Sequence, residues 1–358
     1  MKIAILDRID SYCNPGGDTV QIRAIADFLI KHGFQINILP ELTPDLSEYD
    51  MAIIFNLTRY HEVLLQSITC IKHNISYILF PVYWDLDDIK IPFYGIKSFI
   101  KSNIPKDFVT FSKNMKFVLA RFKWAREIIF SENLSGLVFS KTKILEFVIS
   151  KAKIICPNSY AELNHILQNV TNADKSKFYV IFNGIQKDIY IKGKYKRQGN
   201  LSCIGGIGPR KNQLNLLKAL EKTTIKTELI GNHSKDSEYT KELKKYSFVK
   251  KDWMPHDRVL EYLSSVYAHI QPSFIETPGL VSMEAFALGC KTIVSDVGPV
   301  REYFKEFAYY VDPYSIDSIR NKVEEVFNSK ETIDIEICRA FNEQYSWDNV
   351  LKPLISLF

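Results

Sequence analysis

The sequence has no run approaching the roughly 20 consecutive apolar residues that a membrane-spanning helix requires. It also begins directly with the strand-like residues 2–7 (KIAILD), without the charged region, apolar region and cleavage site of a secretory signal. These absences exclude a helical membrane protein and a signal peptide from our expectations. We expect a soluble protein in the cytoplasm.

Cysteine is scarce and scattered, since none of the six cysteines stands in a CxxC pair or at metal-ligand spacing. This excludes a zinc ribbon and a disulfide scaffold, and it favours buried free thiols in a reducing compartment. We therefore expect no metal held by cysteine. The six are Cys13, Cys70, Cys156, Cys203, Cys290 and Cys338.

The glycine fingerprint G-x-G-x-x-G of dinucleotide-binding folds is missing after the first strand, and no internal repeat or low-complexity tract is present. What remains is a chain of 358 residues with 46% hydrophobic content, long enough for two domains with cores of their own. Its net charge of +5 is mildly basic, which favours anionic ligands or membrane surfaces.

The most informative stretch is 268–302. A short apolar run ends at Pro272-Ser273 and predicts a buried parallel strand. Thr277 as N-cap and Pro278 as first helical residue predict a helix that runs to Leu288 and stops at Gly289. Residues 291–297 (KTIVSDV) predict the next strand. The result is a βαβ unit whose helix begins at the carboxyl end of the sheet, where ligands bind in open α/β folds.

Two carboxylates flank this helix start, Glu276 before it and Glu284 inside it, with seven residues between them. The free N–H groups around Gly279, Leu280 and Val281, together with the positive end of the helix dipole, predict an anion site. The alternative is that both acids only cap and solvate the first turn of the helix, as Asp and Glu commonly do.

This stretch resembles the retaining family 4 glycosyltransferases of GT-B fold, whose paired glutamates appear here as Glu276 and Glu284. The similarity extends through PSFIE, GL, EAFALG and SDVG. The resemblance implies that the helix N-terminus holds the diphosphate of a nucleotide-sugar. It also implies that Glu284 binds the ribose hydroxyls and that Glu276 lies beside the donor sugar.

The loop after the strand 201–204 resembles the phosphate loop of the same family. It reads GGIGPRKN and begins at Gly205; the position of the family's arginine holds Gly206, and Lys211 matches the family's lysine. We expect Lys211, with the adjacent Arg210 in place of the missing arginine, to clamp the diphosphate. The alternative is a basic pair on a solvated helix start, although helix starts disfavour cations.

The first half of the chain carries weaker signals. Gly16 and Gly17 match a glycine pair that the family places near the donor phosphates and the acceptor, or they form a plain turn. Asp85 follows the strand 75–80 where many relatives carry a histidine; it binds a sugar hydroxyl or caps the next segment. Asn183 opens the NGI triplet that resembles the family's interdomain turn, and Asn-Gly is also good turn chemistry.

The segment 90–126 has the most uneven charge in the chain, with nine basic residues, one acid (Asp107) and interleaved aromatic residues. This composition predicts peripheral association with an anionic membrane. Nucleic acid is an alternative partner, but no nucleic-acid motif accompanies the segment. A solvated basic face is another.

Together these features predict an α/β protein of GT-B fold with two facing Rossmann-like domains, a cleft between them and a C-terminal helix crossing back. We expect an acceptor-binding domain at 1–192, a nucleotide-sugar domain at 193–340 and the helix at 341–358. The implied reaction is retaining transfer from a nucleoside-diphosphate sugar to a glycan or lipid-linked glycan, at the inner face of the cell membrane, with no cofactor and no metal. The rival hypotheses are an epimerase or hydrolase of the same fold and a catalytically silent binding subunit.

Overall fold

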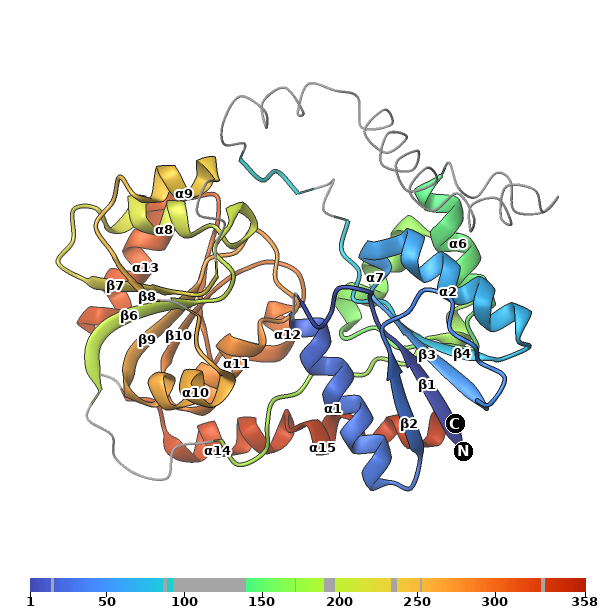
Figure 1. The fold of residues 1–358 in the computed structure, drawn as a ribbon. Coiled ribbons are helices and arrows are strands. Elements are labelled where there is room, and N and C mark those ends of the chain that lie inside the picture. Colours follow the sequence, from blue (N-terminus) through green and yellow to red (C-terminus); the bar gives the residue numbers. More distant parts are fainter. Residues whose placement is uncertain are drawn as a thin grey trace. The chain divides into compact units, whose positions relative to one another are not determined.

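The protein is described here from a computed structural model. The described residues are 1–13, 16–85, 89–92, 140–170, 172–189, 197–232, 237–251, 253–329 and 332–358. They form two compact units (Figure 1). The N-terminal unit comprises the described residues within Met1–Asp87, Asn103–Asn183 and Val350–Phe358, and the C-terminal unit comprises those within Asp88–Ser102 and Gly184–Asn349.

In the part of the chain that the structure describes, the N-terminal unit has a five-stranded parallel sheet in the order β2-β1-β3-β4-β5. Its strands are β1 (Lys2–Leu6), β2 (Gln35–Leu39), β3 (Met51–Phe55), β4 (Tyr77–Phe80) and β5 (Ile154–Ile155). Its helices are α1 (Gly17–Lys31), α2 (Tyr60–Lys72), α6 (Lys141–Lys151), α7 (Tyr160–Asn169) and the 3-10 helices Leu57–Arg59, Lys175–Lys177 and Lys352–Leu357.

The strands β1, β3 and β4 are apolar on both faces because both faces are buried. Ala4, Leu6 and Ile54 pack in one core with side chains of α2 and α6. The alternating residues Ile3 and Ile5 are equally buried but lie outside that cluster. Burial on both faces explains why these strands are nearly continuous apolar runs, whereas the edge strand β2 alternates polar with apolar residues and is partly exposed.

The C-terminal unit has a six-stranded parallel sheet, again counted over the described residues, in the order β11-β10-β9-β6-β7-β8. Its strands are β6 (Gln198–Ile204), β7 (Lys226–Ile230), β8 (Val249–Lys251), β9 (Val266–Gln271), β10 (Lys291–Ser295) and β11 (Tyr309–Val311). Its helices are the 3-10 helix η4 (Pro209–Lys211), α8 (Gln213–Leu220), α9 (Glu238–Leu243), α10 (His256–Ser265), α11 (Leu280–Ala287), α12 (Val300–Phe304), α13 (Ile316–Asn328), α14 (Ile335–Gln344) and α15 (Trp347–Val350), the last of which ends at the unit boundary.

Two separate cores flank this second sheet. Side chains of α8, α9 and α13 pack with alternate residues of β6, β9 and β10 in one of them. Side chains of α10 and α11 pack with Ile204 and Ile230 in the other. The predicted α/β fold with parallel sheets is therefore confirmed in both units.

Some predicted segments differ from the structure. The apolar run 178–182, which the sequence predicts as a strand, forms one isolated bridge, from Phe178 to Ile155. The N–H groups of Tyr179 and Ile181 still donate to the carbonyls of Ile155 and Pro157, both at 2.9 Å, but β5 ends at Ile155 and no regular ladder forms beyond it. The predicted basic segment 90–126 lies outside the described residues except for its first three positions. Within the described residues, no helix is long and apolar enough to cross a membrane.

Candidate active site

Two loops meet at the carboxyl edge of the C-terminal sheet, one after β6 and one after β9. The two strands are parallel neighbours, so both loops leave the sheet on the same side. The N–H of Phe274 donates to the carbonyl of Arg210 at 3.0 Å and ties the loops together. The site that the sequence predicted from two distant stretches is thus one continuous region of the C-terminal unit.

Glycine shapes the first loop at two places. Gly205 has φ +141°, in the region that favours glycine. Gly231, in the turn after β7, has φ +143°, and a Cβ there would lie 2.1 Å from the carbonyl oxygen of Gly205. The sequence reasoning assigned no role to Gly231, whose only signal was its position directly after an apolar strand. Its lack of a side chain lets the β7 turn pass against the loop.

Lys211 and Glu276 form an ion pair that joins the two loops. Lys211 Nζ donates to Glu276 Oε2 at 2.6 Å, and the two side chains are only 17% and 10% exposed. Ser273 Oγ donates to the same carboxylate oxygen at 2.9 Å. Burial alone would raise the pKa of Glu276, but the charges of Lys211 and Arg210 outweigh it and hold that pKa below its ordinary value. Glu276 is therefore an ionised, fixed carboxylate at neutral pH.

The loop GGIGPRKN leads directly into α8, as its sequence suggests. Residues Pro209–Lys211 form the 3-10 turn η4, Asn212 has φ +60°, and α8 starts at Gln213. The Asn212 amide is buried and donates to the carbonyls of Pro272 and Pro313 at 2.9 and 2.8 Å. Asparagine tolerates this left-handed conformation better than most residues. The break in the helix directs Lys211 toward Glu276, while the neighbouring side chain of Arg210 stays exposed.

The helix after the second loop begins later than the sequence predicted. The prediction placed the N-cap at Thr277, whereas α11 begins at Leu280 with Gly279 as its N-cap at φ +90°. A Cβ on Gly279 would lie 2.9 Å from Glu276 Cγ, so only glycine fits this turn beside the carboxylate. The first helical bonds are donated by Ser282 and Met283 to the Gly279 carbonyl. The N–H groups of Leu280 and Val281 precede those bonds, as an anion site at a helix start requires.

Glu284 lies one turn into α11 and is 4% exposed. Its Oε1 is 2.7 Å from His256 Nε2, on α10. Its Oε2 is buried and has no hydrogen-bond partner among the residues that the structure describes. The hydrogen bond to Glu284, together with its negative charge, raises the pKa of His256. The sequence reasoning missed His256, because nothing in its own stretch shows that α10 packs beside α11.

A second histidine lies beneath the helix start. His269 on β9 is fully buried, and its Nε2 is 3.1 Å from Ser282 Oγ. The pKa of His269 is lowered to about 3, mainly by burial and also by the nearby positive charge of Lys211. This ring is neutral at physiological pH and supports the first turn of α11 without adding charge.

The remaining predicted site residues lie in the N-terminal unit. Gly16 caps α1, and its N–H donates to Thr19 Oγ1 at 3.2 Å; Gly17 opens the helix, with no atom within 4 Å of a Cβ built on it. Asp85 pairs with Lys141 at 2.8 Å. Asn183 is buried and is the last residue of this unit before the chain enters the C-terminal unit.

Asp85 is also the first residue of an Asp-Leu-Asp triplet, and carboxylates spaced in this way can hold a divalent cation. The other two residues of the triplet, Leu86 and Asp87, lie outside the described residues. The Asp85 N–H donates to His165 Nε2 at 3.0 Å, so a histidine does stand near the end of β4, supplied by α7. Across the described ranges, no group of three His, Cys, Asp or Glu side chains is placed to hold a metal ion.

An ion-pair network that the sequence reasoning missed lies beside Gly16. Arg8 follows β1 and pairs with Asp10 and Asp18, both at 2.9 Å. Arg59 donates to the second oxygen of Asp10 at 2.8 Å, and Asn56 donates to Asp18 at 3.0 Å. The carboxyl ends of β1 and β3 therefore carry a polar, largely pre-ordered surface.

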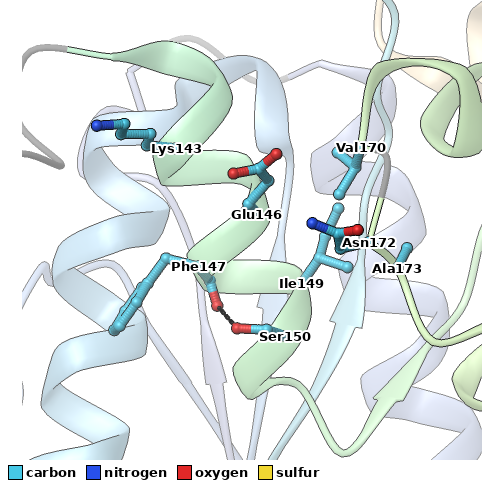
Figure 2. Close-up of a pocket in the computed structure, with 8 residues that line it drawn as sticks. All are labelled: Lys143, Glu146, Phe147, Ile149, Ser150, Val170, Asn172 and Ala173. Atoms are coloured by element: carbon cyan, nitrogen blue, oxygen red, sulfur yellow. Dashed lines mark hydrogen bonds between the residues drawn. The ribbon is translucent and has the colours of Figure 1, made fainter.

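A separate hollow of about 380 Å³ lies between α6 and the chain around Asn172 (Figure 2). Figure 2 shows Glu146 and Ile149 extending from α6 toward Val170 and Asn172. None of its lining residues belongs to the predicted site, and we assign it no function. Its lining is Lys143, Glu146, Phe147, Ile149, Ser150, Val170, Asn172 and Ala173.

Comparison with known proteins gives consistent matches. Residues 185–344 match the family described as Glycosyl transferases group 1. The chain is 22% identical to the uncharacterized glycosyltransferase MJ1607 of Methanocaldococcus jannaschii, over 96% of this chain and 94% of that protein. It is 24% identical to the O-antigen chain mannosyltransferase RfbU of Salmonella typhimurium, over 58% of this chain and 60% of that protein.

Among solved structures, the chain is similar to Anabaena Alr3699/HepE in complex with UDP-glucose. The TM-score is 0.66 at 14% identity, over 99% of this chain and all of that chain. The likeness shows a shared fold. Together with the family match, it places the two parallel sheets in the GT-B architecture and a glycosyltransferase domain at residues 185–344.

Proposed function

We propose that this chain, a glycosyltransferase of GT-B fold, moves a sugar from a nucleoside-diphosphate sugar to a glycan or lipid-linked glycan acceptor with retention of anomeric configuration. The observation that carries the proposal is the buried ion pair of Lys211 and Glu276 at the carboxyl edge of the C-terminal sheet. In this pair, the ammonium group of Lys211 can bind the leaving phosphate. The ionised carboxylate of Glu276 lies beside it and can face the sugar.

The donor's diphosphate has several partners in this region. Lys211 and the exposed Arg210 are cationic, and the N–H groups of Leu280 and Val281 open α11 at its positive end. Glu284 offers a buried oxygen with no partner, which suits a ribose hydroxyl. The UDP-glucose bound by HepE supports this class of donor.

The chemistry requires charge balance at both ends of the breaking bond. Arg210, Lys211 and the helix dipole stabilise the leaving diphosphate, so the proposed mechanism needs no metal. An oxocarbenium-like sugar carries positive charge, and the ionised carboxylate of Glu276 balances it. Because Glu276 is already fixed by Lys211 and Ser273, it needs little reorganisation when that charge develops.

The acceptor is assigned to the N-terminal unit, where Gly16, Gly17, Asp85 and Asn183 lie. An O-antigen chain mannosyltransferase among the relatives supports a role in cell-surface polysaccharide synthesis. We place this protein in the cytoplasm at the inner face of the membrane, where it would meet a lipid-linked glycan.

A donor screen followed by a turnover assay tests the proposal. UDP-, GDP- and ADP-sugars are compared by thermal shift, because a ligand that binds the native state raises its stability. Release of nucleoside diphosphate is then measured with and without glycan acceptor, in the presence of a chelator, and the product anomer is read by NMR. We expect acceptor-dependent release and a retained anomer. Acceptor-independent release would indicate a hydrolase or a hydrolysing epimerase. Binding with neither release nor epimerisation of the donor sugar would indicate a silent subunit.

A further inference from the structure

The contact between His256 and Glu284 is an unusual feature of the C-terminal unit. Glu284 is buried in α11, yet its partner His256 is the first residue of α10, and the side chain of His256 is 51% exposed. Oε1 of Glu284 accepts a hydrogen bond from His256 Nε2 at 2.7 Å. Oε2 is buried and has no hydrogen-bond partner in the described part of the chain. A buried acceptor left unpaired costs free energy unless a ligand or water supplies a donor.

We propose that His256 is a positioning residue for the nucleotide: it holds Oε1 of Glu284 so that Oε2 accepts a hydroxyl of the donor's ribose. This rests on the proposed function, since it assumes that Glu284 faces the ribose. His256 touches neither substrate nor the reacting atoms, and it acts only through the carboxylate.

The positions of the two residues support an orienting role. A glutamate side chain has several accessible rotamers, and one strong hydrogen bond at 2.7 Å removes most of that freedom before the ligand arrives. α10 and α11 pack in a common apolar core with Val259, Leu263 and Ala285, so the distance between the two residues is fixed by the fold. The ligand then binds a carboxylate that is already oriented.

The proposal implies a pH dependence with a definite sign. The charged groups that raise the pKa of His256 are Glu284 on α11 and Asp257 beside it on α10. A protonated imidazole holds the carboxylate as a charged pair, and this attraction disappears as pH rises through the raised pKa of His256. Nucleotide affinity therefore falls as pH rises through that range.

The test measures affinity for the nucleoside diphosphate of the accepted donor by calorimetry from pH 6 to pH 9. His256→Ala is expected to weaken binding by roughly tenfold at pH 6, the size of one hydrogen bond to a charged group. His256→Gln keeps a donor that does not titrate, so it is expected to recover much of the affinity and to give a flatter pH profile. Arg258→Ala on the same helix, whose exposed side chain pairs with the exposed Glu261, is the matched control and keeps the wild-type profile.

Three outcomes are separable. Wild-type affinity in His256→Ala, in a protein with unchanged Tm, would overturn the positioning role. Affinity that rises with pH in the wild type, and rises further in His256→Ala, would show that the histidine competes with the ribose and would also overturn it. Failure of the wild-type protein to bind any nucleoside diphosphate would instead overturn the proposed function.

Discussion

Three buried glutamates in this protein show how the same side chain acquires different properties from its partners. Glu276 has a lysine partner, and Glu284 has a histidine partner and one free oxygen. Glu162, at the start of α7 in the N-terminal unit, accepts backbone N–H bonds from Tyr83 at 2.6 Å and Asn158 at 2.5 Å. Burial outweighs these bonds and raises the pKa of Glu162 to about 7. Only the first two lie in the candidate site.

Substitutions of the two site glutamates are expected to change different kinetic constants. Glu284→Ala loses a charge-assisted hydrogen bond to the ribose and should weaken donor binding by roughly 1.5–3 kcal/mol, seen mainly in KM. Glu276→Gln keeps the size of the side chain but removes its charge, so it should mainly lower kcat. Steady-state kinetics of both variants with a common donor checks this split. Wild-type values of kcat and KM in both variants, with the fold intact, would refute the site assignment.

Glu162 predicts a pH dependence of stability near neutrality. Its folded-state pKa of about 7 exceeds its ordinary value of 4.5, so its contribution to stability is fully present below pH 4.5 and is lost as pH rises through 7. Urea unfolding at pH 5 to 8 should show this loss in the wild type, and Glu162→Gln should lack it. Glu228 provides the control. Burial would raise its pKa, but hydrogen bonds from Lys251 and Tyr262 hold that pKa at about 2, so Glu228 does not titrate between pH 5 and 8. Glu228→Gln should therefore keep the wild-type slope of stability against pH. Parallel curves for wild type and Glu162→Gln would contradict the assignment.

Individual site residues were predictable from the sequence only where pattern and spacing identify them. The pairing of Glu276 with Glu284, and the loop ending in Lys211, could be read along the chain. His256 and Gly231 could not, because their roles depend on which helix and which turn pack beside the site in three dimensions. Sequence spacing gives no information on such contacts between elements.

The loop between β9 and α11 is the element on which the site depends. Its geometry combines a glycine in a left-handed conformation, a helix that starts two residues later than Thr277-Pro278 suggested, and a carboxylate packed against that glycine. The prediction was wrong about the cap because Thr and Pro are good first residues in general. Here the turn that seats Glu276 requires φ +90°, which only Gly279 supplies without strain.

Gly279→Ala is expected to disturb this loop. The added Cβ would lie 2.9 Å from Glu276 Cγ in a conformation that costs an L-residue about 1–2 kcal/mol. We expect a lower Tm and a lower turnover, because the carboxylate must move. Gly199→Ala in β6, where a Cβ meets no atom within 4 Å, is the control and should leave turnover unchanged. Full activity in Gly279→Ala would show that the loop tolerates displacement of Glu276.

Strand prediction succeeded where burial on both faces gives an apolar run. β1, β4 and β10 all lie within a residue or two of the predicted ranges 2–7, 75–80 and 291–297. The segment 178–182 is also apolar, but it forms a single bridge beside the short strand β5, and Tyr179 within it is 46% exposed. An apolar run therefore determines neither the burial of every side chain nor the pairing of the strand, because both depend on the rest of the fold.

At the scale of the whole molecule, each unit has its own sheet and its own core, and the polar groups lie at the carboxyl edges of both sheets. We propose that the C-terminal unit holds the donor and the N-terminal unit the acceptor. The charge pattern along the chain adds a further element, the basic segment 90–126 with one acid among nine bases.

That segment predicts binding to anionic vesicles. Each Lys or Arg near an anionic surface contributes about 1 kcal/mol, so a few together give measurable binding at physiological salt. Co-sedimentation should be strong with anionic vesicles at low salt and weak with neutral vesicles or at high salt. The charge reversal of Lys97, Lys101, Lys113 and Lys116 to Glu should abolish it. Binding that ignores lipid charge, or that survives the reversal, would exclude this role.

The central claim is that the loops around Lys211 and Glu276 bind the diphosphate of a nucleotide-sugar. The most direct measurement compares calorimetric affinities for the donor's nucleoside diphosphate and for its bare nucleoside, in the wild type and in Lys211→Met. Only the diphosphate carries charge for Lys211 to bind, so the substitution should weaken diphosphate binding by about tenfold or more and leave nucleoside binding nearly unchanged. Equal losses for the two ligands, or no loss for either in a folded variant, would contradict the claim.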